Sequence, residues 1–202
     1  MEITVWIEFA SPYSYLAVER LTGAGMPAAV AVRWKPMLLG PIFKAQGWDT
    51  SPFLIYPAKG RHMWRDMERL CADAGIPFVR PALFPQHTVL AARIACLGAG
   101  EDWQADYIRA VFRANFAEGR DISDAGVLGG ILAGLGLDAA GLLAEAPAAR
   151  DALRANVEEA QALGVFGAPT FITGGELFWG ADRLDQALAW AGRPAPGPAP
   201  GK

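Results

Sequence analysis

The sequence predicts an α/β fold in which a large all-helical block interrupts a small sheet. Apolar residues alternate with the period of a strand near the start of the chain and again after residue 169. Between about residues 61 and 163 the apolar residues instead recur at helical spacing, without a strand pattern. This long helical run argues against a regularly alternating α/β sheet. A length of 202 residues suits one domain that carries an inserted subdomain.

The composition excludes several classes of protein and of site. The net charge is only −3, with 19% charged residues, so no global electrostatic feature indicates nucleic acid. Two cysteines make no disulfide framework, and two histidines are too few for a patterned metal site. No apolar run is long enough to cross a membrane, and Met1-Glu2 leads directly into a strand without room for a signal peptide. We therefore expect a protein of the reducing cytoplasm that binds no nucleic acid, membrane or metal.

The first elements form a β-α-β unit. Apolar residues alternate along residues 3–9, which indicates a strand. A short amphipathic helix follows and stops at Gly23-Ala24-Gly25, and residues 28–34 carry the β-branched pattern of a second strand. The two strands should be parallel and their connection right-handed.

The junction of the first strand and helix is Ser11-Pro12-Tyr13-Ser14. Ser11 suits a helix N-cap, and Pro12 suits the first turn because its missing N–H has no partner there. A helix N-terminus of this kind attracts an anion, a thiolate included. Thioredoxin-like proteins place Cys-x-x-Cys at this corner, but serines replace both sulfurs here. A disulfide oxidoreductase is therefore the least expected function, because two-electron exchange needs a dithiol. An ordinary N-cap is the alternative interpretation of Ser11.

Residues 35–57 lose periodicity and collect prolines, glycines and aromatic rings. We interpret them as an ordered irregular segment of the kind that forms the wall of a binding site. Helices are then expected over residues 61–74, 88–97, 102–117, from Ser123 or Asp124 to about Gly136, 138–144 and 148–163. Cys71 and Cys96 fall at apolar positions and are interpreted as core residues.

The strand pattern returns as a hairpin, with strands at residues 170–173 and 177–179. A last helix spans residues 182–191. The order β-α-β, helices, β-β-α is that of a thioredoxin fold with an inserted helical domain. We assign residues 1–58 and 164–192 to the thioredoxin-like domain, 59–163 to the helical domain and 193–202 to a flexible tail.

Three motifs together resemble the 2-hydroxychromene-2-carboxylate isomerase family, which shares a DsbA-like fold with kappa-class glutathione transferases. They are Ser11-Pro-Tyr-Ser-Tyr-Leu-Ala17, Gly164-Val-Phe-Gly-Ala-Pro-Thr-Phe171 and Gly175-Glu-Leu-Phe-Trp-Gly-Ala-Asp-Arg-Leu184. Each motif is weak alone, but they occur in the family's order with the helical insertion between them. The resemblance covers essentially the whole chain up to Gly192.

The resemblance implies glutathione in the groove of the thioredoxin domain, with its sulfur beside Ser11. A free thiol has a pKa of about 8.5. A hydrogen bond donated by Ser11 to the sulfur anion is worth about 1.5–3 kcal/mol and a helix N-terminus about 0.3–2 kcal/mol. Because one pKa unit equals about 1.4 kcal/mol, the two effects together can lower the thiol pKa by about one to three units. Ser11 is thus expected to be a catalytic hydrogen-bond donor and not a nucleophile.

The resemblance also implies the other contacts to glutathione. Ala168-Pro169 matches the family's cis-proline loop, where the backbone of residue 168 pairs with the cysteinyl backbone of glutathione. Asp182 and Arg183 match the pair that holds the γ-glutamyl end, although Asp182 is equally suited to be the N-cap of the last helix. Lys59, expected in a loop, matches a lysine near the glycyl carboxylate.

Asp49 departs from the family pattern. Relatives often carry an asparagine here that contacts glutathione. An aspartate loses the amide donor and adds a negative charge near an anionic ligand, which should weaken glutathione binding. Asp49 is still a cofactor-binding candidate because it stands at the position of that asparagine.

The function implied is a glutathione-dependent isomerase that converts 2-hydroxychromene-2-carboxylate to trans-o-hydroxybenzylidenepyruvate in aromatic degradation. Lys35, Lys44 and Arg93 are unranked candidates for the cation that meets the substrate carboxylate. A kappa-like transferase that conjugates glutathione to electrophiles and a non-redox thioredoxin-fold binding module are the alternatives. Family members of this shape commonly form homodimers, so the resemblance also implies a dimer.

Overall fold

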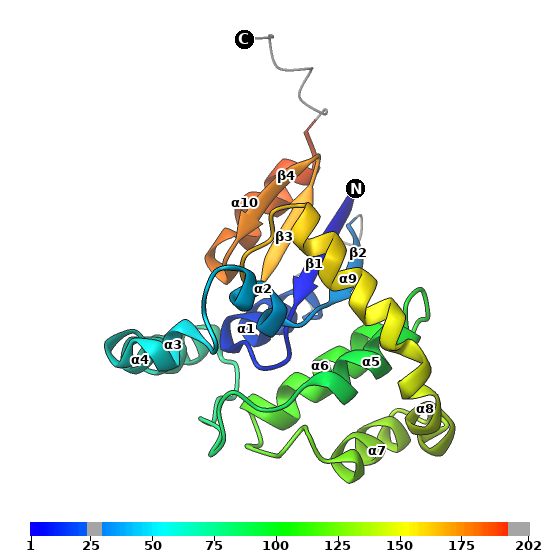
Figure 1. The fold of residues 1–202 in the computed structure, drawn as a ribbon. Coiled ribbons are helices and arrows are strands. Elements are labelled where there is room, and N and C mark those ends of the chain that lie inside the picture. The colour runs from blue at the N-terminus through cyan, green and yellow to red at the C-terminus, as the bar shows by residue number, and fades with distance from the viewer. Residues whose placement is uncertain (24–29, 194–202) are drawn as a thin grey trace.

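The computed structural model describes residues 1–23 and 30–193 and confirms a sheet interrupted by helices (Figure 1). The elements are β1 (Glu2–Ile7), α1 (Pro12–Leu21), β2 (Ala31–Pro36), α2 (Leu39–Ala45), α3 (Pro52–Ile55), α4 (Pro57–Ala74), α5 (Val89–Leu97), α6 (Gln104–Phe116), α7 (Ala125–Gly134), α8 (Ala139–Glu145), η1 (Ala146–Ala149), α9 (Arg150–Ala162), β3 (Thr170–Thr173), β4 (Glu176–Trp179), η2 (Ala181–Arg183) and α10 (Leu184–Ala191). The end of the expected glycine stop at residues 24–25, the expected strand start at 28–29 and the tail at 194–202 lie outside the described residues.

The sheet has four strands in the order β2-β1-β3-β4. Strands β1 and β2 are parallel, with Val5 opposite Trp34, as the β-α-β prediction requires. Strand β3 runs antiparallel to β1, with Val5 opposite Phe171, and pairs with β4 in the predicted hairpin. The order and directions confirm the predicted thioredoxin fold.

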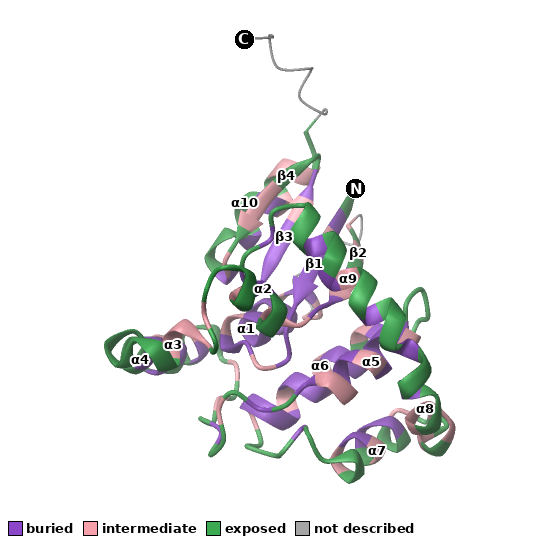
Figure 2. Ribbon diagram, in the orientation of Figure 1, coloured by how far each residue is buried: buried purple, intermediate pink, exposed green. Residues whose placement is uncertain are grey.

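Strand β1 carries the core because both of its faces are buried (Figure 2). Ile3, Val5 and Ile7 point to the face packed by α1 and α10, and belong to the main apolar cluster. Trp6 points to the opposite face and packs with residues of α2 and α9. This is the two-residue period of a strand buried on both sides.

A buried carboxylate connects α1 to α6 of the helical block. Glu19 of α1 has a side chain only 4% exposed, and it accepts hydrogen bonds from Arg109 and Arg113 of α6. The closest contacts are 3.2 Å to Arg109 Nη2 and 2.7 Å to Arg113 Nε. Burial alone would raise the pKa of Glu19, but these hydrogen bonds and positive charges outweigh it and lower the pKa.

Residues 35–57 contain two short helices, so their prediction as an irregular segment was wrong in part. Ser51 caps α3 by accepting a hydrogen bond from the Phe53 N–H, and Pro52 occupies the first turn. A Cβ on Gly60 would lie 2.4 Å from the carbonyl oxygen of Phe53, so only glycine lets α3 pack this closely on α4. Helix α4 begins at Pro57 instead of residue 61, which places Lys59 in a helical turn and not in the expected loop.

The last helix also begins differently. It was predicted from residue 182, but α10 starts at Leu184 and Asp182 lies in the 3-10 turn η2. The Asp182 side chain makes no capping hydrogen bond, so its interpretation as an N-cap was wrong. Its carboxylate is exposed.

The two cysteines are core residues, as expected. Cys71 is 1% exposed and Cys96 is 9% exposed. Burial raises the pKa of each thiol to about 11, so both are held as uncharged thiols near neutral pH.

Within residues 1–23 and 30–193, no helix is long and apolar enough to span a membrane, and no group of three or more His, Cys, Asp or Glu side chains could hold a metal ion.

We expect Glu19→Gln to lower the free energy of unfolding by about 1–3 kcal/mol at pH 7, because it removes a charged acceptor from two arginines. The folded pKa of Glu19 is lowered, so its contribution is present above the ordinary carboxyl pKa of about 4.3 and is lost as the pH falls. The stabilities of wild type and variant should therefore converge at acid pH, as urea denaturation can measure. Asp151→Asn, which breaks an exposed pair with Arg154, is the control and should cost less than about 1 kcal/mol. An unchanged difference down to pH 3 would contradict this account.

Candidate functional site

The Ser11 corner has the predicted geometry. Ser11 is the N-cap of α1, and its Oγ accepts a hydrogen bond of 3.2 Å from the Ser14 N–H. The same hydroxyl donates a hydrogen bond of 2.9 Å to the carbonyl oxygen of Ala168. Ser11 is only 7% exposed, so this contact is made in a nearly dry position. The hydroxyl is therefore a directed donor at a helix N-terminus.

The opposite wall of the corner is the loop before β3. The Ala168-Pro169 peptide bond is cis, as the motif predicted. The Thr170 hydroxyl donates to the Gly167 carbonyl at 2.8 Å, which closes the turn. The Pro169 carbonyl accepts from the Gly180 N–H at 3.0 Å. This hydrogen bond connects the cis-proline loop to the turn that carries Asp182 and Arg183.

Asp182 and Arg183 are exposed at the end of the sheet where the cis-proline loop lies. Their side chains form a pair of 3.7 Å, which is long and solvated. Tyr13, on the first turn of α1, donates its hydroxyl to Asp66 at 3.0 Å. Burial, then the Asp66 hydrogen bond and charge, raise the pKa of Tyr13, and the charge of Asp182 adds to that rise. Asp182 thus lies close enough to act electrostatically on the corner.

The structure does not join Lys59 and Asp49 to the other candidates. Both are exposed, and within the described ranges neither forms a hydrogen bond or ion pair with another candidate residue. The Lys59 ammonium lies over the ring of Tyr56, 4.9 Å from its centroid. Asp49 follows α2 in a bend. Their assignment to glutathione stays a prediction.

The sequence interpretation missed Glu8, which lies three residues before Ser11. It is 5% exposed and accepts hydrogen bonds from the Thr88 hydroxyl at 2.6 Å and the Leu39 N–H at 2.9 Å. Burial raises the pKa of this carboxyl, although the hydrogen bonds that it accepts oppose the rise. Glu8 ties the end of β1 to the starts of α2 and α5. A charged residue at the end of a buried strand was the available signal.

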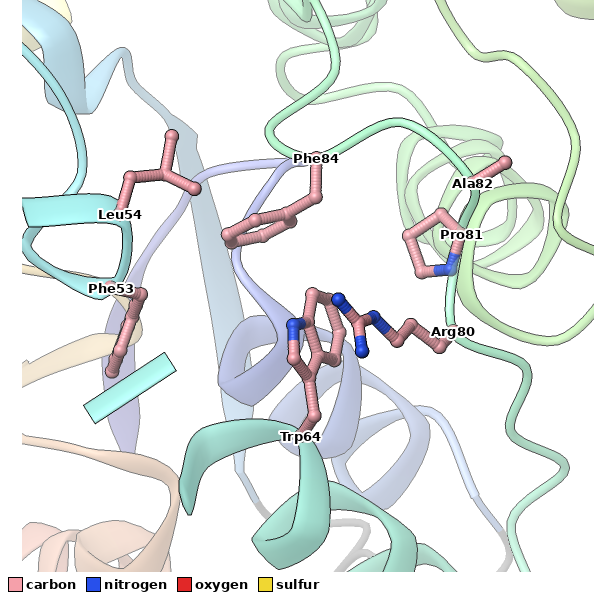
Figure 3. Close-up of a pocket in the computed structure, with 7 residues that line it drawn as sticks. All are labelled: Phe53, Leu54, Trp64, Arg80, Pro81, Ala82 and Phe84. Carbon is pink, nitrogen blue, oxygen red and sulfur yellow. The ribbon is translucent and has the colours of Figure 1, made fainter. Parts of the chain in front are cut away.

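A cavity of about 380 Å³ lies near α3 and α4 (Figure 3). It lies between α3, α4 and the loop that precedes α5. The lining residues are Phe53, Leu54, Trp64, Arg80, Pro81, Ala82 and Phe84. The ring of Phe53 lies 6.4 Å from the ring of Tyr13, which is two residues from Ser11. Of the aromatic residues in the segment 35–57, Phe53 lines this cavity, and the segment's role as the wall of a binding site stays a prediction.

The three candidate cations do not line this cavity. Lys35 forms an ion pair of 2.8 Å with Glu159 and lies at a different surface. Arg93 has a buried Nε, and Lys44 lies in α2. The cation in the cavity is Arg80, which sequence reasoning missed because its neighbours come from distant segments.

These groups define what the site can do chemically. Ser11 supplies a hydrogen-bond donor, the start of α1 supplies positive partial charge, and the loop at Ala168 supplies an extended backbone edge. No cysteine stands at the corner. The site can therefore stabilise a sulfur anion but cannot supply one, so a thiol reaction here requires a thiol from a ligand.

Comparisons with known proteins support the fold described above. Residues 2–189 match the family of DSBA-like thioredoxin domains. The chain is 30% identical to a 2-hydroxychromene-2-carboxylate isomerase of Sphingobium xenophagum, over 91% of this chain and 94% of that protein. It is 24% identical to a glutathione S-transferase kappa 2 of Caenorhabditis elegans, over 97% and 94%. A solved structure of a 2-hydroxychromene-2-carboxylate isomerase superposes with a TM-score of 0.86 at 26% identity, over 95% of both chains.

We expect Ser11→Ala and Ser14→Ala to change stability differently. Ser11→Ala removes the cap of α1 and the bond to Ala168, so it should cost about 1–2 kcal/mol. The Ser14 hydroxyl is buried without a hydrogen-bond partner in the described structure, so Ser14→Ala should be neutral or stabilising. Chemical denaturation of both variants measures the difference. Equal losses would show that the Ser11 contacts do not hold the corner.

Proposed function

We propose that this protein is a glutathione-dependent isomerase. The chain belongs to the family of DSBA-like thioredoxin domains, and within it to the 2-hydroxychromene-2-carboxylate isomerases, which supports the proposal. The substrate would be 2-hydroxychromene-2-carboxylate and the product trans-o-hydroxybenzylidenepyruvate, in aromatic degradation. The observation that carries the proposal is the Ser11 hydroxyl, aimed across the corner at Ala168 where the chain itself has no sulfur.

Glutathione, when bound, would supply a thiolate nucleophile for reversible addition to a conjugated bond of the ring-opened substrate, so that the former double bond can rotate before glutathione is eliminated unchanged. The protein's part is to stabilise and orient that thiolate. Ser11 is the donor available to the sulfur anion, and the N-terminus of α1 adds its partial charge. The hydroxyl leaves its partner Ala168 to do so, which frees a carbonyl for the cofactor backbone.

The remaining candidates would hold the rest of the cofactor. Asp182 and Arg183 lie one hydrogen-bonded turn from the cis-proline loop and suit the charged γ-glutamyl end. Lys59, exposed on the first turn of α4, suits a carboxylate at the other end. With the resemblance as support, we extend the proposal to a cytoplasmic homodimer.

A kappa-like glutathione transferase is the second candidate. The similarity to the kappa transferase of Caenorhabditis elegans over 97% of this chain favours this candidate. Product analysis separates the two reactions. An isomerase returns free glutathione in full, whereas a transferase consumes it into a conjugate.

We expect glutathione to bind with its thiol pKa about one to three units below 8.5, and Ser11→Ala to reverse most of this shift. The ultraviolet absorbance of the thiolate, followed across pH, measures it. Isomerase turnover by Ser11→Ala should fall about tenfold or more, while Ser14→Ala should retain both the shift and the turnover. Wild-type turnover by Ser11→Ala would remove Ser11 from the mechanism. Absence of glutathione binding to the wild type would leave the binding module as the better description.

We expect Asp49→Asn to bind glutathione about two- to fivefold more tightly, because it removes a negative charge near an anionic ligand. Titration calorimetry measures the change. Asp151→Asn makes the same change in charge on α9 and should leave the affinity as it is. Unchanged or weaker binding by Asp49→Asn would place Asp49 outside the cofactor site.

A further inference from the structure

We propose that the cavity beside Tyr13 binds an aromatic carboxylate, with the carboxylate paired to Arg80 and the ring held by Trp64, Phe84 and Phe53. The inference deepens the proposed function and rests on it for the identity of the natural substrate. It makes Arg80 the residue that selects an anionic substrate. The cavity itself is a property of the structure that can be tested without glutathione.

The size and walls of the cavity suit a small planar molecule. Its volume of about 380 Å³ lies within the range of sites for small ligands. The Trp64 and Phe84 rings meet edge to face, with centroids 4.8 Å apart. Figure 3 shows Phe53 and Leu54 on one side and the Arg80–Pro81–Ala82 stretch on the other. Aromatic walls of this kind hold a flat ring by apolar contact and ring stacking.

Arg80 is the charged group of this cavity, and it is held in place. Its guanidinium lies over the ring of Trp64, 5.0 Å from the centroid. A cation in this position is attracted by the ring and loses side-chain freedom before a ligand arrives. The plane of a guanidinium also matches a carboxylate in a two-bond contact, which an ammonium does not offer.

No acidic side chain among the described residues is paired with Arg80. None of the seven lining residues is acidic, and within residues 1–23 and 30–193 Arg80 forms no ion pair. Several other arginines of the described chain have a carboxylate partner, as Arg109 and Arg113 have in Glu19. Arg33, Arg61, Arg93, Arg150 and Arg193 share with Arg80 the lack of an ion pair among the described residues, but none of them lines this cavity. An exposed guanidinium without a carboxylate in an aromatic cavity is complementary to a ligand that carries both a ring and an anion.

The cavity is connected to the Ser11 corner through Phe53 and Tyr13. Phe53 belongs to its wall and packs on Tyr13, whose hydroxyl is held by Asp66 of α4. The loop that carries Arg80 leads to Thr88, which is hydrogen-bonded to Glu8 beside the corner. A ligand against Phe53 is therefore separated by the rings of Phe53 and Tyr13 from the corner at which the thiolate is proposed to form.

The test uses the full chain without glutathione and two probes, trans-2-hydroxycinnamate and its methyl ester. Titration calorimetry should show the wild type binding the acid about tenfold or more tightly than the neutral ester. Arg80→Gln should abolish this preference by weakening the acid and leaving the ester unchanged. Arg80→Lys keeps the charge without the planar fork and should recover only part of the preference.

The matched control is Arg193→Gln. Arg193 also stands over a tryptophan, 4.5 Å from the ring of Trp190, but it lies after α10 and outside the cavity. It should leave both probes unaffected. Equal affinity of the wild type for acid and ester, or an unchanged acid affinity in Arg80→Gln, would overturn the proposal.

The two proposals fail in different ways. Arg80-dependent binding of the acid by a protein that binds no glutathione would support the cavity assignment and reject the glutathione-dependent function. A lowered thiol pKa for bound glutathione, together with no preference for the acid, would support that function and reject Arg80 as the anion site. Glutathione affinity should be the same in Arg80→Gln and wild type, and a parallel loss of both ligands would overturn the assignment of Arg80 to a separate site.

Discussion

The hydrogen bond from the Ser11 hydroxyl to the Ala168 carbonyl is the contact on which the corner depends. It joins residues that are 157 positions apart, and the entire helical block lies between them in the sequence. It requires a helix that starts at Ser11 and a loop turned by a cis bond at Pro169. Each half is built by short-range rules, but only the fold of the sheet brings donor and acceptor to 2.9 Å. A directed donor of this kind is the feature that a bound thiolate can use.

The helical block separates Ser11 from Ala168 in the sequence and also contacts the segments that lead to and follow Ser11. Asn115 of α6 donates to the Phe9 carbonyl at 3.0 Å, two residues before Ser11. Glu19 binds the same helix through Arg113, so α1 is held along its length against α6. The cavity lies between α3, α4 and the loop that precedes α5 (Figure 3). The Ser11 corner and the cavity thus both depend on contacts between the helical block and the rest of the chain.

The sequence predicted some site residues better than others, because some features depend on adjacent residues and others on residues far away along the chain. The cap of Ser11 was predictable because it depends on a few adjacent residues, whereas the cis bond at Pro169 was expected from the resemblance to the family. The cap assigned to Asp182 was wrong because a 3-10 turn moves the helix start to Leu184. Arg80 had no local signal, because its partner Trp64 lies on another element. The roles of the candidates toward glutathione stay predictions.

By itself the sequence determined the strands of the sheet, the helical interruption and the Ser-Pro corner. These features are written in residue spacing and capping, which act over a few positions. The tertiary structure alone decided that the Ser11 hydroxyl is directed at Ala168, that Glu8 is buried against Thr88, and that Arg80 stands unpaired in an aromatic cavity. The physical reason is distance along the chain: such contacts arise from packing between remote segments, and no local pattern records which segments will meet.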